Sequence, residues 1–146
     1  MNRTAGIALL KAVLWGGFAG AAPFLLFTVP FGMNLFAARQ TDIGLFTAIW
    51  GMVFPLVVAW LGTLIGAIVV GLPVTRLLAS SGLERGRFYI LAGLIGGSLP
   101  FLLAGLSPDT VWLMAFSIPG GLAGAVAGWH WGRHRDAVIA ARGSAA

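Results

Sequence analysis

Residues 16–26 read GGFAGAAPFLL, and residues 93–103 read GLIGGSLPFLL. Both follow the pattern G-x-x-x-G-x-x-P-F-L-L, with one copy in each half of the chain. Each copy lies inside an apolar stretch long enough to cross a bilayer as a helix, which takes about 20 residues. The sequence therefore predicts a membrane protein built from two similar helical hairpins.

The composition also indicates a lipid environment. Of the 146 residues, 59% are hydrophobic and 9% are charged, and the mean hydropathy is +0.96. Soluble domains contain about 45–50% apolar and about 25% charged residues, so a soluble fold of this length could not hide so much apolar surface. The chain has no cysteine, which excludes disulfides and thiolate ligands.

Four apolar stretches predict an all-α, polytopic bundle of four transmembrane helices in one domain covering residues 1–146. Two tandem hairpins in the same orientation would form a parallel internal repeat. The continuous apolar runs exclude a membrane β-barrel, whose strands alternate in polarity. The predicted spans are residues 7–29, 43–71, 88–106 and 110–132.

The segments between the predicted spans differ in character. Residues 30–42 predict a partly apolar connection, and residues 72–87 predict a helix end followed by a basic loop. Residues 133–146 form a short tail with little apolar periodicity, which we expect to be cytoplasmic and mobile.

Positive charge is distributed unequally between the two sides of the predicted bundle. Eight of the nine basic residues lie in the N-terminal part, between spans two and three, or in the tail, and only Arg39 lies on the other side. Cytoplasmic loops are rich in Lys and Arg, so we expect both termini in the cytoplasm. All basic residues except Lys11 are Arg, which fits a GC-rich bacterial genome. Together with the four predicted spans, this leads us to expect a bacterial inner-membrane protein.

The basic residues flank apolar segments instead of forming a basic soluble domain. They therefore predict contact with anionic lipid headgroups, and no nucleic-acid partner. Lys11 lies about one turn inside the first span, and we expect its side chain to reach back to the interface. Trp15 and Trp129 fit an aromatic belt at the inner boundary, whereas Trp60 should lie near mid-depth as a packing or lipid-facing residue.

Small residues recur at every fourth position of the predicted spans. Helices in lipid associate through such faces, because lipid tails are as apolar as leucine. The unbroken strip on the fourth span has two interpretations: packing inside the bundle, or a homo-oligomer seam. The predicted packing glycines are Gly16, Gly20, Gly62, Gly66, Gly93, Gly97, Gly120, Gly124, Gly128 and Gly132.

Each predicted span also contains a proline, which removes a helical hydrogen bond and kinks the helix. Small hydroxyl side chains lie at a similar depth. They either return hydrogen bonds to freed backbone groups or line a pathway between kinked outer half-helices, as broken helices do in repeat-built transporters. The prolines are Pro23, Pro55, Pro100 and Pro119, and the hydroxyl residues are Thr28, Thr47, Ser98 and Ser117.

Few residues in the sequence suit catalysis. None of the four acids lies deep in a predicted span, where proton-coupled transport needs an ionisable group. His130 and His134 have the i, i+4 spacing of two metal ligands, but two ligands make an incomplete site, and we interpret both as interfacial. Ser98 has no base at its depth. We therefore expect no enzymatic activity, no metal and no cofactor.

Two functions remain open from the sequence. The first is a structural or accessory bundle that packs against itself, another membrane protein or lipid. The second is a small channel or carrier whose pathway is lined by the proline-kinked outer half-helices. The first is our leading interpretation because polar side chains within the spans are sparse.

Overall fold

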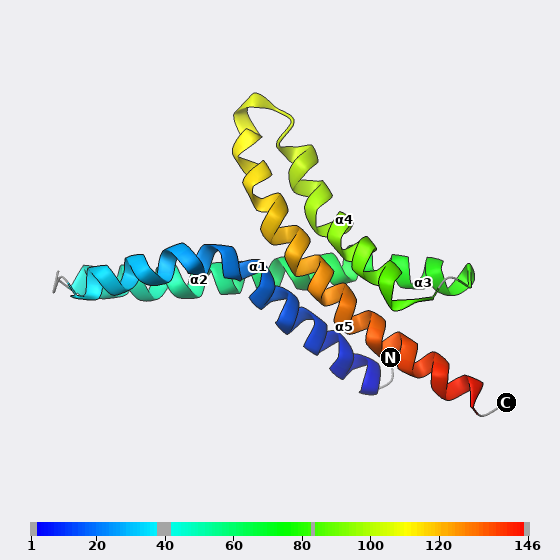
Figure 1. Ribbon diagram of the computed structural model, residues 1–146. Coiled ribbons are helices and arrows are strands. Elements are labelled where there is room, and N and C mark those ends of the chain that lie inside the picture. The colour runs from blue at the N-terminus through cyan, green and yellow to red at the C-terminus, as the bar shows by residue number, and fades with distance from the viewer. Residues whose placement is uncertain (1–2, 38–41, 83, 145–146) are drawn as a thin grey trace.

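The computed structural model describes residues 3–37, 42–82 and 84–144. Every regular element in these residues is a helix, and four helical segments are long and apolar enough to cross a membrane (Figure 1). The prediction of an all-helical protein with four candidate spans is confirmed. The length and apolar composition of these four helical segments indicate an integral membrane protein.

The first hairpin consists of α1 (Arg3–Ala37) and α2 (Asp42–Gly66), which lie side by side (Figure 1). α1 extends past the predicted span of 7–29, because the first part of the predicted connection is helical through Ala37. Pro23 and Pro30 both lie inside α1. The helix bends along its length (Figure 1), and internal prolines are a common cause of such bends. Arg39 lies outside the described residues.

The second candidate span continues beyond α2 through the π-helix η1 (Ala67–Gly71) into α3 (Leu72–Ser80). The amide of Leu72 donates to the carbonyl of Ala67, five residues earlier. Pro73 explains this widened turn, because in a regular α-helix its ring would clash with the carbonyl four residues before it. The chain then turns at Gly82, whose φ of +67° favours glycine. Much of the predicted connection is therefore helical, since α3 continues to Ser80 and α4 already begins at Gly86.

The second hairpin consists of α4 (Gly86–Ala104), the 3₁₀-helix η2 (Pro108–Phe116) and α5 (Ser117–Gly143). Residues 133–143 of the predicted tail belong to α5, which continues to Gly143. Residues 137–141 read AVIAA, and alanine is the strongest helix former. Contacts of Arg135 and Asp136 with the start of α4, described below, hold this part of the helix in place.

The two hairpins cross near the middle of the molecule and diverge from there (Figure 1). α5 is the central helix, with α1 along one face and α4 along another, whereas α2 packs mainly on α1. The N-terminus, α3 and the C-terminus lie toward the same side of the molecule (Figure 1). Few side chains are fully enclosed, and the buried apolar residues are mostly small: Ala12, Val13, Ala21, Tyr89 and Ala123.

Trp60 joins α2 to α1. Its indole Nε1 donates to the carbonyl of Leu14 at 3.2 Å, and its ring meets Phe18 edge-on, with centroids 5.3 Å apart. Gly17 lies directly beneath the indole, where a Cβ atom would overlap the ring. The side chain is therefore a packing residue of the first hairpin.

We predict that Trp60→Phe lowers the free energy of unfolding by about 1 kcal/mol, the usual value of one such hydrogen bond. The measurement is SDS-induced unfolding in detergent followed by circular dichroism. Trp50→Phe is the matched control, because Trp50 is 56% exposed. Equal losses in the two variants would show that the Trp60 contact contributes nothing specific.

Candidate functional site

Glycines of α4 and α5 bring these two helices into direct contact. A Cβ atom on Gly124 would overlap the carbonyl of Gly93, and a Cβ atom on Gly93 would overlap the carbonyl of Gly124. The two backbones therefore touch directly, which only glycine permits. The same contact continues along α5 in three further pairs: Gly97 with Gly120, Tyr89 with Gly128, and Gly86 with Gly132. Within one chain, α4 thus occupies the glycine strip of the fourth span.

The glycines of the first sequence copy have different surroundings. A Cβ atom on Gly16 would lie 2.7 Å from the carbonyl oxygen of Ala123 and 2.8 Å from the methyl group of Thr63. One on Gly20 would lie 2.9 Å from the Cβ atom of Ala123. Gly16 and Gly20 therefore lie between α2 and α5, whereas Gly93 and Gly97 meet α5 of their own hairpin. The parallel repeat stays a prediction.

Gly62 and Gly66 of α2 have no close neighbour. No heavy atom lies within 4 Å of a Cβ atom built on either residue, apart from the helix's own backbone. Both are exposed. These two glycines have the same spacing as those of α5, but in the described part of the chain no helix packs on them.

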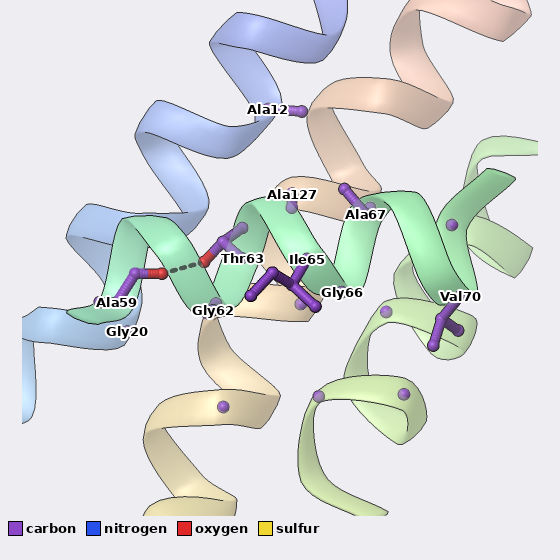
Figure 2. A pocket seen from close by; sticks show the side chains of 18 of the residues that line it. Ala12, Gly20, Ala59, Gly62, Thr63, Ile65, Gly66, Ala67, Val70 and Ala127 are labelled. Atoms are coloured by element: carbon purple, nitrogen blue, oxygen red, sulfur yellow. Dashed lines mark hydrogen bonds between the residues drawn. The ribbon is translucent and has the colours of Figure 1, made fainter. Parts of the chain in front are cut away.

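An apolar groove of about 440 Å³ lies among α1, α2 with η1, α4 and α5. Figure 2 shows its wall on α2, with Ala12 and Gly20 of α1 and Ala127 of α5 nearby. Thr63 is turned back along its helix, and its Oγ1 donates to the carbonyl of Ala59 at 2.7 Å (Figure 2). The lining is almost wholly apolar. This surface therefore suits hydrocarbon or an apolar helix face.

Three of the four predicted prolines border the groove: Pro55, Pro100 and Pro119. Pro55 and Pro100 lie inside α2 and α4. Pro119 lies in the first turn of α5, where the missing amide breaks no bond of that helix. Pro23 lies inside α1 and is not among the lining residues.

None of the four predicted hydroxyl residues lines the groove. Ser117 donates to the carbonyl of Met114 at 2.6 Å, and Ser98 lies in the α4–α5 contact, where a Cβ atom on Gly121 would overlap its Oγ. Thr28 Oγ1 is buried and has no hydrogen-bond partner among the described residues, and Thr47 is exposed. The structure does not bring these side chains together around the groove.

A polar cluster at the start of α4 was missed by the sequence analysis. Glu84 Oε1 accepts hydrogen bonds from Arg135 Nε at 3.0 Å, from a second nitrogen of the same guanidinium, and from the Tyr89 hydroxyl at 3.2 Å. Asp136 Oδ1 accepts from the amide of Gly86 at 3.1 Å, one of the first-turn amides that lack a helical partner. The cluster fastens α5 to the α3–α4 turn.

Aromatic and basic side chains of α1 and α5 meet on another side of the molecule. The ring of His130 stacks on Trp15, with centroids 6.0 Å apart and planes 12° apart, and meets Trp129 at 4.8 Å. The guanidinium of Arg133 lies 5.2 Å from the Trp129 ring centroid. Lys11 and Arg133 both interact electrostatically with His130.

The two histidines pack against different indoles, since His134 lies 5.6 Å from the Trp131 ring. In residues 3–37, 42–82 and 84–144, no three His, Asp or Glu side chains gather as metal ligands would. Comparison with protein-family models, curated proteins and solved structures finds no match to this chain.

Proposed function

We propose that the protein is a small, non-enzymatic accessory bundle of a bacterial inner membrane, which pairs with a second copy of itself through α2. The observation that carries this proposal is the open glycine face of α2. The glycines of α4 and α5 meet each other inside the chain, whereas Gly62 and Gly66 meet no other described residue. In lipid, such a face is where a neighbouring helix can approach most closely.

The α2 face forms one wall of the apolar groove, because Val58, Gly62, Ile65 and Gly66 line it. This face has the shape that self-association requires. Val58, Leu61 and Ile65 are exposed to 48%, 55% and 60%, and their spacing places them on the same side of the helix as Gly62 and Gly66. Large side chains thus lie beside a shallow depression at the two glycines. Such a face is complementary to itself, so two copies can pair about a two-fold axis with each ridge in the other's groove. It carries no charge that would repel a second copy.

The proposed orientation places both termini in the cytoplasm. The N-terminus, α3 and the C-terminus lie toward one side of the molecule (Figure 1). The contact of Glu84 with Arg135 joins the α3–α4 turn to the last part of α5. Segments rich in Arg therefore gather at one end, which supports an assignment by the positive-inside rule.

A carrier of apolar molecules is the second candidate function, and the groove is the observation that favours it. Because the lining is apolar and the four hydroxyl residues lie elsewhere, the cargo that fits is a hydrocarbon chain. Crosslinking with a lipid that carries a diazirine on its acyl chain tests this candidate. Labels on Val70 and Ala92 of the groove would support it, whereas equal labelling of all lipid-facing residues would contradict it.

We predict that Gly62→Leu combined with Gly66→Leu converts a dimer into a folded monomer. The added side chains fill the face that a second α2 would approach. Mass photometry in nanodiscs measures the oligomeric mass, and circular dichroism checks the fold.

The matched control adds bulk to another side of α2, as Val57→Phe with Leu64→Phe, and should remain dimeric. A monomeric wild type, or a dimer that survives Gly62→Leu with Gly66→Leu, would overturn self-association through α2. If Gly124→Leu dissociated a dimer while leaving each chain folded, the seam would lie on the fourth span instead.

A further inference from the structure

A cluster on α1 and α5 has no part in the α2 face or the groove. We call it the basic–aromatic patch, and its members are Lys11, Trp15, Trp129, His130 and Arg133. None of the five lines the groove. Lys11 and Trp15 are one helical turn apart on α1, and His130 and Arg133 are nearly one turn apart on α5. The stack of Trp15 on His130 holds the two helices together at this point.

The basic–aromatic patch brings two cationic side chains toward one imidazole. Lys11 and Arg133 come from different helices, and both interact electrostatically with His130. Both side chains are exposed, and no carboxylate of the described residues forms an ion pair with either. An anion from outside the chain would therefore meet no competing carboxylate of the described residues at either side chain.

An acid of the α3–α4 turn and an acid of α5 have other partners. Glu84 pairs with Arg135, and Asp136 accepts the amide of Gly86. The polar cluster therefore uses these carboxylates on another side of α5. Because these two carboxylates bind other groups, Lys11 and Arg133 are available to a ligand.

The patch also lies at the depth of lipid headgroups in the proposed bundle. Lys11 lies about one turn inside the predicted first span, 7–29, and Arg133 directly follows the predicted fourth span, 110–132. Trp15 and Trp129 are 56% and 42% exposed, as expected of indoles in the interfacial belt. Basic pockets between helices at this level bind anionic headgroups.

We propose that the basic–aromatic patch binds the phosphate group of an anionic phospholipid. Lys11 and Arg133 pair with the phosphate oxygens from two sides, and the indoles of Trp15 and Trp129 lie along the glycerol and the upper acyl chains. The proposal requires α1 and α5 to cross a bilayer. It does not require self-association through α2, so the two proposals can fail separately.

Native mass spectrometry of the purified protein in mixed micelles of phosphatidylglycerol and phosphatidylcholine tests the proposal. We expect the wild type to retain phosphatidylglycerol preferentially. Lys11→Gln with Arg133→Gln should weaken this retention roughly 30-fold, from the contribution of two basic side chains near a membrane surface. Arg3→Gln with Arg142→Gln removes the same charge outside the patch and should change retention little.

Three outcomes would overturn the proposal. Equal weakening by both double variants would mean that net charge, and not a site, attracts the lipid. Equal retention of both lipids by the wild type would mean that the patch does not select an anionic headgroup, since both lipids carry a phosphate. Displacement of phosphatidylglycerol by millimolar inorganic phosphate would assign the patch to a soluble anion. Lys11→Arg with Arg133→Lys keeps the charges and should retain the lipid, which guards against a loss caused by misfolding.

Discussion

Gly124→Ala is expected to lower the free energy of unfolding by roughly 2–3 kcal/mol, at the upper end of the cost of overpacking a core. The added methyl group would overlap the carbonyl of Gly93. That oxygen belongs to a helix backbone and cannot rotate away, so α4 and α5 must separate to admit it. Separation would also disturb the three neighbouring pairs of the same contact. SDS-induced unfolding in detergent, followed by circular dichroism, measures the loss.

Gly51→Ala is the matched control for this prediction. Gly51 is also a helical glycine, but nothing lies within 4 Å of a Cβ atom at its position. In the absence of steric conflict, alanine should raise stability by up to about 1 kcal/mol through its helix propensity. The two variants make the same chemical change, so their effects should have opposite signs. If Gly124→Ala changed the free energy of unfolding no more unfavourably than Gly51→Ala does, direct backbone contact between α4 and α5 would be contradicted.

The glycines of α2 and α5 illustrate what could be predicted from the sequence. Apolar composition and length fix the number of candidate spans, because no other structure satisfies the backbone in lipid over such runs. A four-residue spacing identifies a face of a helix but does not name its partner. Gly62 and Gly66 have the same spacing as Gly120 and Gly124, yet one pair is open and the other is covered by α4.

Helix ends and polar contacts were harder to predict. The continuation of α5 beyond residue 133 depends partly on the contacts of Arg135 and Asp136 with Glu84 and Gly86. Contacts between residues so far apart in the sequence cannot be predicted from its periodicity. The apolar groove likewise results from how the two hairpins cross. The one available signal was the small number of acids. The chain has only four acidic residues among nine basic ones, so Glu84 and Asp136 could be expected to bind basic side chains or backbone amides.

Glu84→Ala should lower the free energy of unfolding by about 2 kcal/mol, within the range for a hydrogen-bonded charged group. One carboxylate oxygen serves both Arg135 and the Tyr89 hydroxyl, and the side chains of Arg135 and Glu84 are only 21% and 15% exposed. Removing the acceptor leaves a half-buried guanidinium and a buried hydroxyl without their partner. Glu84→Gln should cost less, because its amide oxygen can still accept from Tyr89.

Hydrogen exchange separates a local effect of Glu84→Ala from global destabilisation. Amides in the first turns of α4, from Tyr89 onward, should exchange faster, because the cluster holds that helix end against α5. Amides near Gly97 should change only as much as global stability does. Asp109→Ala, in the first turn of η2, removes an acid at the opposite end of α4 and serves as the control. If combining Glu84→Ala with Arg135→Gln cost the sum of the two single losses, the ion pair would contribute nothing of its own to the fold.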